Sequence, residues 1–290
     1  MQRERLTDDI FVFTSDRYVQ VTATVIFTAK GVVVFDTLPF PDETRRMVDF
    51  IRRANRGPVR YLILSHSHAD HVYGAFLMPE AEIIAHRRCY DLLSRHGRRG
   101  LEEAQRAEPE LMEVVLRYPG LWVETDAALR MGDKTIQFYH SPGHTPDVIG
   151  AYIPEERTLI ASDTMMPVPY IADGDPHQLI ASLRALRGFQ SEHLIQGHGD
   201  ILLRGEISTM IAENIAYLEK LIAVVEGAVE AGTPAEDLLR IPLEEFGKER
   251  ILLEGLAPQI HAANLMAYYQ KYKRKTKRNA KKHAQDDDVS

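Results

Sequence analysis

Histidine and aspartate residues follow several short apolar runs of this sequence, each at the point where the run ends. The run YLIL leads into the densest group, His66-x-His68-x-Asp70-His71. Other runs end in one such residue each, and the complete set is Asp36, His66, His68, Asp70, His71, His144, Asp163 and His198. Imidazole nitrogens and carboxylate oxygens are the ligands of zinc and similar divalent ions. Since residues beyond strand ends lie on loops anchored by a rigid scaffold, this pattern predicts a metal centre.

The spacing within the densest group allows two ions to be bound close together. In an extended or tightly turned segment, His66 and His68 point the same way and can share one ion. Asp70 and His71 follow the turn and can face a second ion nearby. The small serine and alanine between these ligands leave room for both ions to approach.

These residues and their order resemble the metallo-β-lactamase superfamily, over roughly residues 10–200. The family motif H-x-H-x-D-H is intact at 66–71, and later family positions match His144 in SPGHTPD, Asp163 in ASDT and His198 in QGHG. The resemblance implies two ligand sets with one bridge, namely His66, His68 and His144, then Asp70, His71 and His198, with Asp163 between them. Asp36 matches an acidic residue that supports the site in this family.

The resemblance also implies a fold and a chemistry. The fold is a four-layer αββα sandwich, with two divalent ions at one edge between the sheets; zinc is expected, and manganese or iron are alternatives. With Asp70, Asp163 and a bridging hydroxide, two divalent ions leave a net charge of about +1, which suits an acidic substrate and an anionic intermediate. Asp70 or a nearby tyrosine, Tyr170 or Tyr73, is the expected proton-transfer residue.

Asp163 narrows the expected reaction. True β-lactamases of this superfamily usually lack an aspartate there, whereas glyoxalase II, lactonases, phosphodiesterases and related esterases have one. The sequence therefore predicts a metal-dependent hydrolase that uses the bridging hydroxide on an ester, thioester or lactone. Hydrolysis of a phosphodiester or a β-lactam is the alternative. From another class, a non-catalytic metal-binding protein or an iron redox protein stays open.

The hydrophobic pattern predicts the strands and helices that position these residues. Strands are predicted at 9–14, 18–28, 31–36, 60–66, 81–86, 135–141, 148–154, 158–163 and 193–198. Helices are predicted at 42–55, 176–188, 206–230, 234–240 and 258–273, and a helical stretch broken near Gly97 and Gly100 is predicted at 87–118. This pattern predicts an α/β sandwich with a helical C-terminal extension. The domains are then a catalytic domain at 1–204 with a helical insertion at about 87–127, an extension at 205–273 and a charged, disordered tail at 274–290.

Composition narrows the class of partner. The chain has 290 residues, 44% of them apolar and 27% charged, with a net charge of −7. This charge does not favour binding to nucleic acid or to a membrane, although the basic segment 271–282 is one feature in favour of nucleic acid. The single Cys89 excludes an intramolecular disulfide, and the N-terminal sequence lacks the pattern of a signal peptide, so a cytoplasmic location is expected. The expected partner is a small acidic or amphipathic molecule.

Three further groups of residues are weaker candidates. The Met- and Pro-rich loop after Asp163 offers Met165, Met166 and Tyr170 as a wall for the substrate. In the insertion, the apolar side chains that can form a lid or a homodimer contact are Tyr118, Leu121 and Trp122. Lys248 and Arg250 suggest the basic residues of the glyoxalase II extension, without a specific match.

Overall fold

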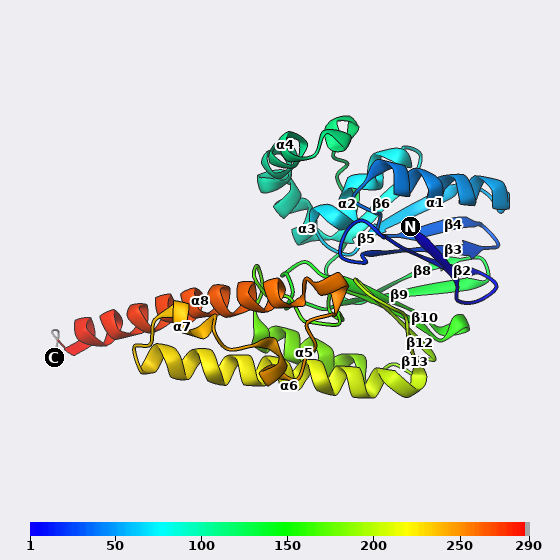
Figure 1. Ribbon diagram of the computed structural model, residues 1–290. Helices are drawn as coiled ribbons and strands as arrows, with labels where there is room; N and C mark the ends of the chain where they lie inside the picture. The colour runs from blue at the N-terminus through cyan, green and yellow to red at the C-terminus, as the bar shows by residue number, and fades with distance from the viewer. Residues whose placement is uncertain (288–290) are drawn as a thin grey trace.

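The computed structural model describes residues 1–287 and contains two β-sheets with helices on both outer faces (Figure 1). The first sheet has the order β1 (Gln2–Arg5), β2 (Ile10–Thr14), β3 (Thr22–Thr28), β4 (Gly31–Phe35), β5 (Val59–Leu64), β6 (Glu82–His86) and β7 (Leu121–Val123). The second sheet has the order β13 (Leu202–Leu203), β12 (His193–Gln196), β11 (Thr158–Ser162), β10 (Ile149–Ile153), β9 (Lys134–His140) and β8 (Ala127–Met131).

The helices divide between the two sheets. The helices on the side of the first sheet are α1 (Pro41–Ala54), α2 (Ala69–Val72), α3 (Arg87–Leu92) and α4 (Arg98–Ala107). Those on the side of the second sheet are α5 (Pro176–Leu186), α6 (Arg204–Glu230), α7 (Ala235–Leu238) and α8 (Ala257–Asp287). The predicted four-layer sandwich with a helical C-terminal extension is therefore confirmed.

Alternation along each central strand supplies two cores at once. In β4, Val33 and Phe35 face the second sheet, whereas Val32 and Val34 face α1. Such two-sided burial explains why β4 reads as a continuous apolar run and not as an alternating one. A third cluster joins the outer face of the second sheet to α5, α6 and α8. Because each large buried side chain contributes roughly 1.5–3 kcal/mol, the strands form a rigid frame for the residues at their ends.

Parallel pairing brings the ends of these strands to one edge. β4 pairs in parallel with β5, and β11 pairs in parallel with β12. Asp36, which follows β4, and Ser162, which ends β11, have φ values of 61° and 46°, in the left-handed region. The turn at Ser162 directs Asp163 to this edge, and the Asp36 side chain accepts from the amide of Ser65, directly before the 66–71 segment.

The helical insertion differs from its prediction. α3 continues into α4 through a π-helical turn at Leu93–Gly97, so the break predicted near Gly97 and Gly100 is wrong. The wider turn accommodates Gly97, whose position lies close against Leu116 and Leu93. After a 3-10 turn at Pro109–Glu113, the chain forms the short strands β7 and β8, which the sequence pattern did not indicate.

The C-terminal extension forms long helices along the second sheet. α8 continues to Asp287, well beyond its predicted end at 273, and therefore includes most of the segment predicted as a tail. Residues 288–290 of that predicted tail lie outside the described residues. Among residues 1–287, no helix is both long and apolar enough to cross a membrane.

Candidate metal centre

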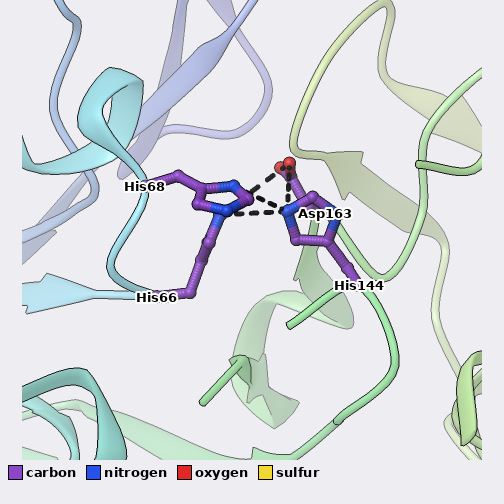
Figure 2. Close-up of side chains that lie close together, drawn as sticks. All are labelled: His66, His68, His144 and Asp163. Carbon is purple, nitrogen blue, oxygen red and sulfur yellow. Dashed lines mark hydrogen bonds and ion pairs between the residues drawn. The ribbon is translucent and has the colours of Figure 1, made fainter. Parts of the chain in front are cut away.

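The strand ends bring all seven predicted ligands together in two adjoining groups. His66, His68, His144 and Asp163 form one group, with their side chains pointing at one another (Figure 2). The Nε2 atom of His144 lies 3.2 Å from Nε2 of His66 and 3.0 Å from Nδ1 of His68. It also lies 3.2 Å from Oδ2 of Asp163. Three imidazoles and one carboxylate thus converge on a space of the size of one ion.

The second group consists of Asp70, His71 and His198. Oδ2 of Asp70 lies 3.6 Å from Nε2 of His71 and 3.3 Å from Nε2 of His198. Asp163 belongs to this group too, because its Oδ1 lies 3.2 Å from His71 Nε2 and its Oδ2 lies 3.5 Å from His198 Nε2. One carboxylate therefore faces both groups, as a bridging ligand must.

The residues present fit two divalent cations. His66 and His71 are fully buried, and the Nε2 atom of His71 has no hydrogen-bond partner. Oδ1 of Asp163 is also buried without a partner. Buried polar atoms are nearly always satisfied, so unpaired nitrogen and oxygen atoms that face one another indicate a missing ligand of positive charge. Imidazole and carboxylate donors in this number suit borderline divalent metals.

Hydrogen bonds on the far side of the rings fix four of the imidazoles. Nδ1 of His71 lies 3.1 Å from Oδ2 of Asp36, and Nδ1 of His66 lies 2.9 Å from the Ser65 hydroxyl. Nδ1 of His144 donates to the Tyr170 carbonyl over 2.8 Å, and Nδ1 of His198 donates to the Val19 carbonyl over 2.8 Å. Each ring then presents Nε2 to the centre, the arrangement that outer partners give to metal-binding histidines. Asp36 has the supporting place that the resemblance implies.

His68 is arranged in the opposite sense. Its Nδ1 faces His144, and its Nε2 lies 3.3 Å from Oδ2 of Asp173. Asp173 was missed by the sequence analysis, because it lies in the loop after Asp163 and belongs to no motif. Its negative charge therefore lies at the rim of the centre, beside one of the ligands.

Burial and neighbouring charges set the protonation of the ligands. Burial lowers the pKa of His144 to about 4 and lowers the pKa of His66 well below its ordinary value. Burial alone would raise the pKa of Asp163, but the surrounding imidazoles, His71 foremost, hold it well below the ordinary value. Two neutral imidazoles and an ionised carboxylate at neutral pH are the forms that bind a metal.

Comparison with known proteins agrees with this geometry. Residues 16–198 match the family described as the Metallo-beta-lactamase superfamily. The chain belongs to this superfamily. The match ends at His198, the last of the seven candidate ligands, and leaves the extension outside it.

Individual superfamily relatives are distant. A linear primary-alkylsulfatase from a Pseudomonas strain is 25% identical over 237 residues, which are 67% of this chain and 45% of the relative. A hydroxyacylglutathione hydrolase from Rhodopseudomonas palustris is 24% identical over 205 residues, 70% of this chain and 71% of the relative. The solved structure of an inverting sec-alkylsulfatase from Pseudomonas has a TM-score of 0.74 at 16% identity, over 93% of this chain and 50% of that one. The chain thus spans about half the length of several proteins that it matches.

The extension, which lies beyond the superfamily match, holds the loop that follows Asp163. Nδ2 of Asn264, on α8, donates to the Pro169 carbonyl over 2.6 Å, and Oδ1 of Asn264 accepts from the Ile171 amide over 2.8 Å. Tyr170 lies between these two bonds, and its carbonyl is the one that His144 meets. On α6, Asn214 donates to the Met166 carbonyl over 2.8 Å. Both asparagines are fully buried, so the extension fixes a ligand of the metal centre through one loop.

A second loop, before β3, reaches the centre from the other side. Val19 and Gln20 have φ values of 47° and 53°, and a positive φ is strained for a β-branched residue such as valine. The strained backbone directs the Val19 carbonyl to His198, and the Gly199 amide donates to the Gln20 carbonyl over 3.0 Å. No pattern in the sequence indicates this role of Val19, because a valine belongs to no ligand or turn motif.

A cavity of about 470 Å³ opens directly over the ligands. Tyr170, the predicted proton-transfer residue, lines it, as does Met166 from the predicted wall. Met165 is fully buried in the core below, so its prediction as a wall residue is wrong. Tyr18, which the sequence analysis did not single out, also lines the cavity, and the negative charge of Asp70 raises its pKa to about 12. Two uncharged tyrosines therefore line the cavity over the ligands.

The insertion borders an adjoining cavity of about 470 Å³ through Leu92, Leu93 and His96, and this cavity shares His68 and Asp173 with the first. Tyr73, the alternative proton-transfer residue, lines this second cavity. Trp122 lies elsewhere, on the edge strand β7, against Tyr90 and under the Arg87 guanidinium. The apolar surface predicted for the insertion is therefore exposed at the sheet edge, and other residues of the insertion face the site.

Proposed function

We propose that this protein is a dinuclear metallohydrolase that cleaves an ester, thioester or lactone. The observation that carries the proposal is the position of Asp163, which lies between two complete ligand groups beside an open cavity. A carboxylate in this place allows two ions to be held close together, which is the arrangement of two-metal hydrolytic sites.

Two bound divalent ions, zinc in our proposal, would supply a water acidic enough to ionise near neutral pH and would polarise the scissile carbonyl. The residues of this chain orient the reacting groups and transfer protons to and from them. Asp70 is held ionised, because the imidazoles of His71 and His198 outweigh the effect of burial and lower its pKa. Tyr170 offers a hydroxyl at the cavity wall. Asp70 and Tyr170 are thus the proposed proton acceptor and proton donor.

The proposed substrate class follows from the leaving group. Esters, thioesters and lactones release an oxygen or sulfur anion that a cation can stabilise directly, so little protonation is required. A β-lactam releases an amine, which must be protonated. The relative named as a hydroxyacylglutathione hydrolase supports hydrolysis of an acyl compound.

An alkyl sulfate ester is the second candidate substrate. The similarity to a linear primary-alkylsulfatase over 67% of this chain favours it. A sulfate monoester keeps a negative charge beside the bond that breaks, and this requirement distinguishes it from a neutral ester.

A matched substrate panel tests the proposal on the zinc-loaded protein. We expect kcat/KM for an aryl ester, a lactone or a glutathione thioester to exceed that for a cephalosporin at least tenfold, which is about 1.4 kcal/mol in barrier. An alkyl sulfate and a bis-aryl phosphodiester complete the panel. A preference for the cephalosporin would contradict the proposal, and a preference for the sulfate or phosphodiester would replace the substrate class.

A further inference from the structure

The cavity over the metal ligands has an apolar wall that the C-terminal extension provides. Leu256, Ile260 and Ala263 line it. Their spacing of four and three residues places them on one face, since such positions lie one above the other on a helix. Leu256 precedes α8 and is 38% exposed, although it is a large apolar residue. An exposed apolar surface directly beside a polar metal centre indicates a binding site for an apolar group.

Other residues of the cavity lining have the same character. Outside the extension, Val19 and Met166 also line the cavity, together with the uncharged side chains of Tyr18 and Tyr170. The amide of Gln259 adds one more neutral donor and acceptor. Apolar walls beside a small number of placed polar groups are typical of a small-molecule site, and about 470 Å³ lies within the usual range for one.

The charged residues of the cavity lining disfavour an anionic group at the apolar wall. Among residues 1–287, no lysine or arginine lines this cavity, whereas Asp173 does. Three basic residues of the extension are paired with carboxylates elsewhere: Lys248 faces Glu213, Arg250 is paired with Glu244, and Lys271 with Asp175. The net charge of about +1 expected at a loaded centre is therefore balanced by Asp173 at its rim. An anionic group against Leu256, Ile260 and Ala263 would have no lysine or arginine of the cavity lining as a partner, and burial of an unpaired charge is strongly unfavourable.

We propose that the group flanking the scissile bond of the substrate is uncharged and apolar, and that it packs against Leu256, Ile260 and Ala263. This inference rests on the proposed hydrolytic function. Of the two kinds of substrate that the sequence predicts, it favours an amphipathic molecule over an acidic one. A short-chain or medium-chain acyl or alkyl group has the required chemistry.

Direct binding tests the inference without turnover. Full-length protein loaded with zinc is titrated calorimetrically with linear methyl ketones of increasing length, which are neutral ester analogues that cannot be hydrolysed. We expect Kd to fall by up to about fourfold per added methylene until the cavity is full. Ketones of equal length with a terminal carboxylate should bind at least tenfold more weakly. Equal affinity along the neutral series, or tighter binding of the carboxylates, would overturn the inference.

Paired substitutions locate the effect on the wall. Ile260→Asp should weaken binding of the longer ketones at least tenfold, with the zinc content unchanged, whereas Ile260→Leu should bind like the native protein. Ile251→Asp is the matched control, because Ile251 is 73% exposed in the same extension and does not line the cavity. If Ile260→Asp does not fold, Leu256→Asp replaces it. Equal behaviour of the Asp variants at the wall and at Ile251 would overturn the inference.

The two proposals fail separately. A protein that binds the ketones with the expected length dependence but cleaves no ester, thioester or lactone supports the apolar site and contradicts the proposed reaction. A protein that cleaves esters with no dependence on length contradicts the apolar site alone.

Discussion

The metal ligands and the partners that orient them come from two differently built regions. The ligands follow the ends of rigid strands of the sandwich, where parallel pairs in both sheets and the packing of the two sheets bring them to one edge. Several of the orienting contacts come from loops and from the extension, through Val19 and through Asn264, which holds the loop of Tyr170. The sandwich therefore determines which atoms can meet a metal, and the loops and extension determine how firmly those atoms are held.

The largest effect is expected for the residue that joins both ligand groups. Asp163→Ala should lower metal content towards one ion per chain and lower kcat by orders of magnitude, because the bridge between the groups is lost. The fold should survive, since the apolar cores do not depend on this carboxylate. Elemental analysis and circular dichroism measure both, with exposed Asp49→Ala as the control. Retention of two ions and full turnover would show that Asp163 is not the bridge.

The next largest effect is expected at Asp36, which supports the ligands from the end of β4. Asp36→Ala removes the partner of His71 Nδ1 and leaves the buried Ser65 amide without its acceptor at 2.7 Å. Metal affinity should fall about 10- to 100-fold, and stability should fall by about 1–3 kcal/mol. Competition with a chelator and thermal unfolding give the two values. Ser162→Ala, which removes only a contact of 3.3 Å to Asp36, should change both much less; an equal loss in the two variants would contradict this role.

A smaller loss of metal affinity is expected for one of the two buried asparagines of the extension, Asn264, and not for the other, Asn214. Asn264→Ala frees the backbone on both sides of Tyr170 and should weaken metal binding about tenfold, at the lower end of the range for outer partners. Asn214→Ala removes a similar buried hydrogen bond at Met166 and should lower stability to a similar extent, with metal affinity retained. Chelator competition at equal degrees of folding compares them. If both variants lose the same metal affinity, Asn264 is structural and does not position His144.

The smallest effect is expected at the end of α8. Removal of residues 275–290 should leave Tm and the hydrolysis rate nearly unchanged, because a highly charged segment buries little apolar surface. In the described part, Lys275, Lys277 and Arg278 are exposed. Thermal unfolding of the truncated and full-length proteins decides this, and a large drop in Tm would mean that the segment packs against the body or a second copy.

The strand-end ligands could be predicted from the sequence, and the contacts that orient them could not. Strand ends are visible as apolar runs followed by a polar ligand, so the seven candidate ligands and an α/β sandwich were predictable from local pattern, whereas the four layers and the division into two ligand groups came from the resemblance to a family. The contacts of Asn264 with Ile171 and of His198 with Val19 join residues 93 and 179 positions apart. No local pattern marks such pairs, and the positive φ of Val19 runs against its own preference. Asp173 and the wall at Ile260 were missed for the same reason.

Elemental analysis of the gently purified full-length protein tests the central claim most directly. The two ligand groups joined by Asp163 predict about two divalent ions per chain, zinc in our proposal, and two again after removal by a chelator and reconstitution. A folded protein that holds no metal after zinc supplementation would contradict the dinuclear centre and every proposal that depends on it.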